Sequence, residues 1–118
     1  MTATIGMVTI DCANPRALAD FWTAALGADV AADYGAFVLL GLPGRGFALG
    51  LQQVPEPRPG KNRMHLDLRS DIGREAETAR LVELGAQVLD EENTVPGLVW
   101  TVLADPEGNE FCVGQTVG

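Results

Sequence analysis

Histidine, cysteine and tyrosine are scarce in this chain of 118 residues, which contains one histidine, two cysteines and one tyrosine. The two cysteines, Cys12 and Cys112, are too few for a disulfide framework, and neither belongs to a CxxC pair. We therefore interpret both as free thiols. Zinc or redox chemistry of the CxxC type is excluded.

Basic residues and long apolar runs are also lacking. Eight Lys and Arg residues stand against sixteen Asp and Glu residues, which gives a net charge of −8. A surface of this charge repels nucleic-acid phosphates and anionic lipids, so we expect neither partner. No apolar stretch approaches the roughly 20 residues that cross a bilayer, and no basic segment followed by an apolar run opens the chain. We expect a cytoplasmic protein without membrane contact.

The hydrophobic content of 47% is enough for one compact domain with its own core. Within it, the order strand, helix, Leu-Gly-Ala-X-Val occurs twice, in "VTIDCANPRALADFWTAALGADV" and in "MHLDLRSDIGREAETARLVELGAQV". Between the repeats, "PEPRPGKN" (55–62) has three prolines in five residues and is typical of a stiff linker. We predict one domain of two modules, about 1–54 and 63–118.

Each module contains signals for one helix. Asn14 suits an N-cap, Pro15 the first helical position, and Gly27 a left-handed end. The apolar stripe of this helix comprises Leu18, Phe21, Trp22, Ala25 and Leu26. A second helix is predicted from Ser70 or Asp71 to Gly85. Its predicted buried side comprises Ile72, Ala76, Ala79, Val82 and Leu84, and its predicted solvated side comprises Arg74, Glu75, Glu77, Arg80 and Glu83.

Short strand candidates surround the helices. They cover about 7–12, 28–33, 36–42 and 47–53 in the first module, and 63–68, 86–90, 98–104 and 109–115 in the second. The order is βαβββ, linker, βαβββ. This order indicates an α+β fold in which the modules form a curled mixed sheet.

Alternation of side chains divides each strand into an apolar face and a mixed face. A concave mixed face would gather polar groups around a cavity, with small residues leaving room for a ligand. The predicted ligand contacts are Met7, Asp11, Gln52, Arg63, Asp67, Trp100 and Cys112, and the predicted catalytic groups are His65 and Glu110. The face that Trp100 occupies is left open. The alternative interpretation is a sheet face that is simply exposed to solvent.

Four segments resemble the vicinal oxygen chelate superfamily, which includes glyoxalase I, extradiol dioxygenases and bleomycin-resistance proteins. They are "VTIDCANPRALADFWTAALG", "VPEPRPGKNRMHLDL", "LVELGA" and "DPEGNEFCV". The chain is most similar to the glyoxalase-like domain group. The resemblance implies paired βαβββ modules that enclose a pocket, and a homodimer.

The resemblance also implies where metal ligands would lie. The four ligand positions of the metal-dependent members fall on Met7, Gly50, His65 and Cys112, with Gln52 the polar residue nearest to the second. Only the position at His65 holds the usual residue. We therefore expect no metal or other cofactor. A divalent ion, if bound, would use His65 and Cys112 with Glu110, Asp67 or Gln52.

Three functions remain open. The first is a module that binds a small organic molecule, as bleomycin-resistance proteins do by sequestration. The second is a lyase or isomerase in which His65 is a general base or, less favoured, a divalent metal acts. The third is structural, with Arg63, Asp67 and Glu110 in an ion-pair network.

Overall fold

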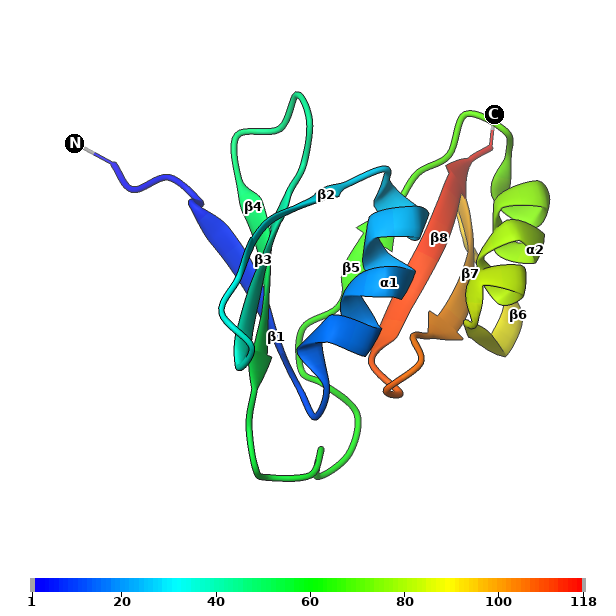
Figure 1. Ribbon diagram of the computed structural model, residues 1–118. Helices are drawn as coiled ribbons and strands as arrows, with labels where there is room; N and C mark the ends of the chain where they lie inside the picture. The colour runs from blue at the N-terminus through cyan, green and yellow to red at the C-terminus, as the bar shows by residue number, and fades with distance from the viewer. Residues whose placement is uncertain (1, 118) are drawn as a thin grey trace. The chain divides into compact units, whose positions relative to one another are not determined.

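The computed structural model describes residues 2–117 and divides into two compact units, unit 1 up to Pro57 and unit 2 from Arg58 (Figure 1). The division lies inside the segment predicted as the linker. Within residues 2–117, neither helix has the length and apolar character needed to cross a bilayer.

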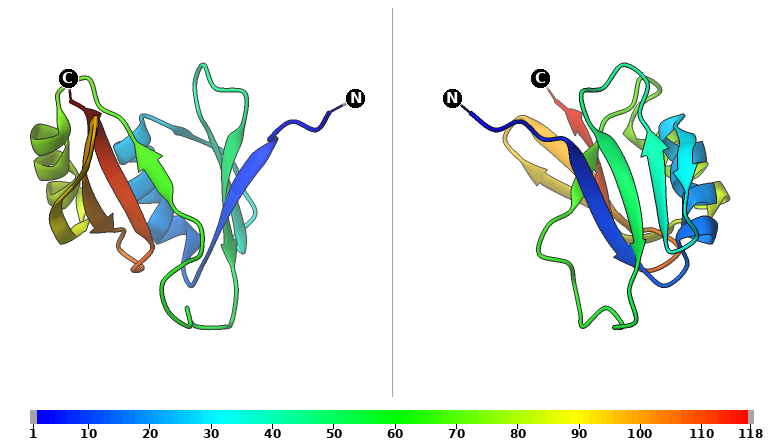
Figure 2. Two further views of the ribbon diagram at one scale, coloured as in Figure 1. Left: turned by 180° about the vertical axis from the view of Figure 1, so that it is seen from behind. Right: turned by 60° about the vertical axis from the view of Figure 1, so that its left-hand side comes forward.

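Unit 1 contains one helix and a four-stranded sheet. Its elements are β1 (Met7–Cys12), α1 (Pro15–Leu26), β2 (Asp29–Asp33), β3 (Phe37–Gly41) and β4 (Ala48–Gln53). The strand order is β1-β4-β3-β2, in which β1 is parallel to β4 and the other pairs are antiparallel (Figure 2).

Unit 2 repeats this plan. Its elements are β5 (Leu66–Leu68), α2 (Arg74–Leu84), β6 (Gln87–Val95), β7 (Leu98–Ala104) and β8 (Glu110–Thr116). The order is β5-β8-β7-β6, and β5 is parallel to β8. The predicted α+β fold of two βαβββ modules with mixed sheets is confirmed.

Local sequence signals define α1 well. The side chain of Asn14 accepts a hydrogen bond from the Ala17 N–H, and Gly27 ends the helix at φ 64° in the left-handed conformation. Four of the five residues of the predicted apolar stripe are buried and Leu26 is half-buried. Trp22 is only 1% exposed and packs edge-on against Phe21 at 5.0 Å between ring centroids. Opposite it, β3 and β4 supply the buried residues Val38, Leu40, Leu49 and Leu51. This packing is the core of unit 1.

The prediction for α2 is wrong in two respects. The helix begins at Arg74, because Gly73 at φ 93° breaks the helical path from Ser70. The buried apolar residue of α2 is Leu81, whereas Ile72 and Val82 from the predicted buried side are 54% and 44% exposed. The residues one and two turns before Leu81 are polar, so the packed face of α2 carries charge.

Arg74 shows how this polar face is packed. Its side chain is 10% exposed, and its guanidinium donates to Thr101 Oγ1 at 2.7 Å and to the Glu91 carbonyl at 3.0 Å. The Arg74 N–H donates to Gln115 Oε1 at 2.9 Å, so a side chain from β8 caps the helix. The side chain predicted to be solvated is therefore an anchor of α2.

Two strand predictions also need correction. The strand predicted at 63–68 is shorter, and His65 lies directly before β5 rather than in it. The strand predicted at 86–90 extends to Val95, with register irregularities between Val88 and Asp90 and between Asp90 and Asn93. These irregularities decide which side chains of β6 share a face.

Candidate functional site

Strand register determines which side chains share a face of the unit 2 sheet. Asp67 pairs with Cys112, which pairs with Val102, so these three side chains form one row across β5, β8 and β7. A second row consists of Asn93, Trp100 and Gly114. Thr101 and Gln115 have the opposite parity and contact Arg74, so both rows lie on the side of the sheet away from α2. We call this surface, with His65 beside it, the polar face of unit 2.

His65 and its neighbours form the densest group of reactive side chains on this face. The ligand atoms of His65, Asp67 and Cys112 all lie within 4.8 Å of one another. His65 Nδ1 lies 3.5 Å from Asp67 Oδ1, with side chains 38% and 67% exposed, while Cys112 is buried. An imidazole and a carboxylate thus lie at the surface above a buried thiol.

Burial raises the pKa of the Cys112 thiol from 9.0 to about 11. The charge of Asp67, and the hydrogen bond it accepts from the thiol, act in the same direction, as does Glu110, while Lys61 opposes them. The thiol is therefore protonated at neutral pH. This disfavours the activated-thiolate state that a cysteine nucleophile requires.

The ion pairs differ from the predicted network. Glu110 Oε1 lies 3.8 Å from Lys61 Nζ, and Asp67 lies beside His65. Arg63 is exposed and belongs to none of the ion pairs found within residues 2–117. The hypothesis of a network among Arg63, Asp67 and Glu110 is wrong, because Lys61 from the predicted linker pairs with Glu110 instead.

The corresponding face of unit 1 is apolar around Gly50. A Cβ atom added to Gly50 would lie 2.9 Å from the Phe37 ring and 3.0 Å from Met7 Sδ. Asp11 pairs with Gln52 in the register of β1 and β4, so the two share this face. The Gln52 amide donates to the carbonyls of Ala36 at 3.3 Å and Gln53 at 3.2 Å. Of the unit 1 candidates, Met7 is part of an apolar cover, and Gln52 is held by backbone groups.

The metal site implied by the resemblance does not fit these residues. At the two unit 1 positions, Met7 offers a weak thioether and Gly50 offers no side chain at all. A carboxylate at position 50 would collide with Phe37. Unit 1 therefore supplies neither of the two ligands that a four-ligand metal site would require from it.

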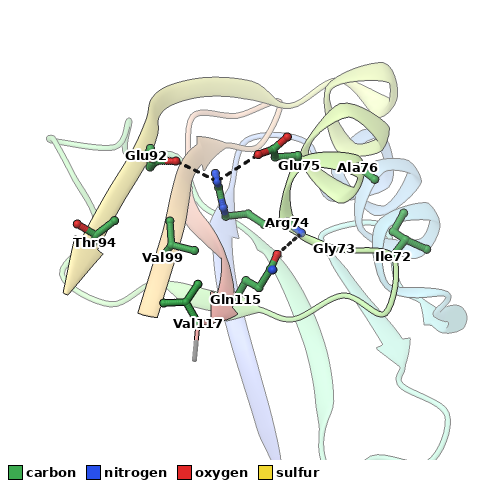
Figure 3. A pocket seen from close by; sticks show the side chains of 10 residues that line it. All are labelled: Ile72, Gly73, Arg74, Glu75, Ala76, Glu92, Thr94, Val99, Gln115 and Val117. Carbon is green, nitrogen blue, oxygen red and sulfur yellow. Dashed lines mark hydrogen bonds and ion pairs between the residues drawn. The ribbon is translucent and has the colours of Figure 1, made fainter. Parts of the chain in front are cut away.

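A shallow pocket in unit 2, of about 740 Å³, lies on the other side of the sheet. Its ten lining residues are Ile72, Gly73, Arg74, Glu75, Ala76, Glu92, Thr94, Val99, Gln115 and Val117 (Figure 3). None of the predicted site residues lines it. Figure 3 shows the Arg74 guanidinium between Glu75 and Glu92, at 3.7 and 3.2 Å. Because these two carboxylates compensate the charge of Arg74, the pocket has little positive charge with which to bind an anion.

Sequence reasoning overlooked Asn93. Its side-chain Nδ2 is buried and has no hydrogen-bond partner in the part of the chain that the structure describes. Buried polar atoms without a partner are rare, and each calls for a physical explanation. Asn93 lies beside Trp100, and no motif indicated it because β6 was predicted to end at residue 90.

Comparisons with known proteins agree with this architecture. The chain resembles a glyoxalase/bleomycin resistance protein/dioxygenase family enzyme from Burkholderia phytofirmans PsJN (18% identity, TM-score 0.80, covering 98% of this chain and 100% of that one). It also resembles a protein from Agrobacterium tumefaciens (21% identity, TM-score 0.81, covering 99% of this chain and 100% of that one). A third similar structure is a glyoxalase/bleomycin resistance protein from Streptomyces sp. CB03234 (25% identity, TM-score 0.66, covering 95% of this chain and 100% of that one). No curated protein matches the chain. The profile of the family described as glyoxalase-like domain matches residues 7–114, and the chain belongs to this family of the vicinal oxygen chelate superfamily.

Proposed function

We propose that this protein binds a small organic molecule on the polar face of unit 2, without the four-ligand metal site of the superfamily. The observation that carries the proposal is the second row of that face, where Trp100 lies between Asn93 and Gly114. An indole offers a broad apolar surface, and the buried Asn93 amide beside it has a donor without a partner in the part of the chain that the structure describes. The indole provides stacking for one small ring, and the Asn93 amide can donate to a carbonyl group of the ligand once the side chains that cover it move aside.

The first row supplies further polar groups on the same face of the sheet. His65 and Asp67 are both exposed, so a ligand can reach them from solvent. The Arg69 guanidinium reaches within 3.8 Å of the Cβ position at Gly114, and so borders the second row. Because the chain carries a net charge of −8, a neutral or cationic ligand suits it better than an anionic one.

Catalysis by His65 is the second candidate. Its Nδ1 lies 3.5 Å from Asp67 Oδ1, and a carboxylate at that nitrogen orients an imidazole as a general base. A lyase or isomerase would use the other nitrogen to remove a proton from the bound molecule. Glu110 fits a catalytic role less well, because its Oε1 is engaged in an ion pair with Lys61 Nζ at 3.8 Å. We place the protein in the cytoplasm as a homodimer, in keeping with the family resemblance.

A small-molecule screen by thermal shift in the presence of EDTA tests binding directly. Each hit is titrated against the parent and the Trp100→Ala and His65→Ala variants. We expect both substitutions to weaken binding by at least about tenfold, equivalent to 1.4 kcal/mol. Product analysis of each hit with the parent and with His65→Gln separates catalysis from binding. Hits that bind all variants equally would show that the ligand lies elsewhere.

A further inference from the structure

We infer that the ligand of the polar face of unit 2 is an aromatic α-amino acid in its zwitterionic form. The inference rests on the proposed function, because it names the ligand class of that same face. Arg69 binds the carboxylate of the ligand, Asp67 binds its ammonium group, and the Trp100 indole stacks on its ring. Such a molecule is neutral overall, in keeping with the net charge of −8 on the chain.

Arg69 is a cation without a carboxylate partner. Its side chain is exposed, and none of the ion pairs found within residues 2–117 contains it, although the chain has sixteen acidic residues for eight basic ones. A guanidinium presents parallel N–H donors that match the two oxygens of a carboxylate, and such bidentate pairs are among the strong hydrogen bonds of proteins. Arg69 is therefore available to a carboxylate of the ligand.

Strand pairing places Arg69 in the same row as Trp100. Leu68 pairs with Val113 in the parallel register of β5 and β8, so the next residue, Arg69, lies beside Gly114, which pairs with Trp100. The guanidinium Nη1 lies 3.8 Å from the position that a Cβ atom would take at Gly114. Because glycine has no side chain, none stands in this row between the guanidinium and the indole.

Asp67 carries the opposite charge on the same face. It lies two residues before Arg69, yet no ion pair joins the two side chains in the described part of the chain. The Asp67 carboxylate lies over the first row instead, with Oδ1 3.5 Å from His65 Nδ1, and the imidazole balances its charge only when protonated. The polar face therefore presents an anion and a cation that are held apart.

The spacing of these two charges suits an α-amino acid. Two residues of a strand advance by about 7 Å, which is the separation of the first and second rows. Charge-assisted hydrogen bonds are about 2.7–2.9 Å long, so one at each end, together with the short span between the ammonium and carboxylate groups, bridges the rows. An aromatic side chain on the same α carbon then has the Trp100 indole as a stacking partner.

The test titrates the full chain with L-phenylalanine and L-tryptophan by calorimetry in the presence of EDTA. Three analogues of the tighter ligand each lack one group. The 3-arylpropanoate lacks the ammonium group, the 2-arylethylamine lacks the carboxylate, and L-alanine lacks the ring. We expect one amino acid per chain, and each analogue to bind at least about tenfold more weakly.

Variants assign each charge of the ligand to its partner. Arg69→Gln should weaken the amino acid and the 3-arylpropanoate at least about tenfold and leave the 2-arylethylamine unchanged. Asp67→Asn should weaken the amino acid and the 2-arylethylamine but not the 3-arylpropanoate. The controls Arg45→Gln and Asp29→Asn remove equal charges from exposed residues of unit 1 and should change no affinity. Circular dichroism confirms that each variant is folded.

Failure of both amino acids to bind the folded parent would overturn the inference. So would an amino acid that binds no more tightly than its 3-arylpropanoate, or an affinity that is unchanged in Arg69→Gln or in Asp67→Asn. If the EDTA screen yields other ligands that depend on Trp100 while neither amino acid binds, this inference fails and the proposed function stands.

Discussion

The two units share one topology but use opposite kinds of side chain at corresponding places. In unit 1 the helix is held by Phe21 and Trp22, and the far side of the sheet is covered by Met7 and Phe37 over Gly50. In unit 2 the helix is held by Leu81 and the Arg74 guanidinium. The far side of its sheet exposes His65 and Asp67 and also carries Trp100. One module is built for packing, and the other retains groups that can bind and react.

The difference follows from the physical cost of polar burial. Apolar side chains stabilise a sheet face by leaving water, whereas a buried guanidinium or carboxylate must find partners. Unit 2 supplies such partners to Arg74 from three elements. A chain built from a repeated module can therefore keep one copy as a stable scaffold and place its reactive groups on the other.

The largest expected effect concerns the aromatic anchor of unit 1. Trp22→Ala removes a side chain that is 1% exposed, and should lower the free energy of unfolding by about 3–5 kcal/mol. Urea denaturation followed by circular dichroism measures it. A loss below 1 kcal/mol would show that α1 is not held by its apolar stripe.

The polar anchor of unit 2 should matter less. Arg74→Met keeps the aliphatic stem but deletes the hydrogen bonds to Thr101 and Glu91, so we expect a loss of about 1–3 kcal/mol. The control is Arg80→Met, whose ion pair with Glu77 lies within one helix turn and should cost less than about 1 kcal/mol. Equal losses in the two variants would contradict the role assigned to Arg74.

Gly50 in β4 and Gly114 in β8 show how differently the two sheet faces accept an added methyl group. Gly50→Ala forces Met7 and Phe37 to move, and should cost about 1 kcal/mol. Gly114→Ala meets nothing closer than 3.7 Å, so it should be neutral or stabilising by up to about 1 kcal/mol. Thermal denaturation of both variants checks the prediction. If Phe37→Leu added to Gly50→Ala restores no stability, the apolar cover is not the cause.

The smallest effect is an alkaline change in stability caused by Cys112. Its pKa is raised from 9.0 to about 11 in the folded chain, so its contribution to stability is fully present below pH 9 and is lost as the pH rises to 11. Cys112→Ser should therefore show a shallower decline between pH 9 and pH 11. Denaturation midpoints across that range test it, and parallel curves for parent and variant would refute it.

Sequence reasoning succeeded where the signals are local. Asn14, Pro15 and Gly27 define α1 through interactions within a few residues, and period-two alternation placed Asp67 and Cys112 on the mixed faces of their strands. The resemblance supplied the architecture. These features depend on residues that are close in the sequence or on a pattern shared by the whole family.

The remaining features depend on contacts between distant residues. The buried side of α2 was predicted from its apolar residues. Thr101 on β7 and Gln115 on β8 accept hydrogen bonds from Arg74, so the side of α2 that carries Arg74 is the packed one. The face of Trp100 depends on its pairing with Gly114. The proximity of Asp67 to Cys112 requires the parallel pairing of strands that lie more than 40 residues apart.

The most direct test of the account compares ligand affinity across the two sides of the unit 2 sheet. For the tightest hit of the EDTA screen, calorimetry gives Kd for the parent, Trp100→Ala and the control Arg80→Met, which alters the side that carries α2. We predict that Trp100→Ala raises Kd at least about tenfold, while Arg80→Met leaves it unchanged within about twofold. An unchanged Kd in Trp100→Ala, or an equal rise in both variants, would contradict the proposal that the polar face of unit 2 binds the ligand.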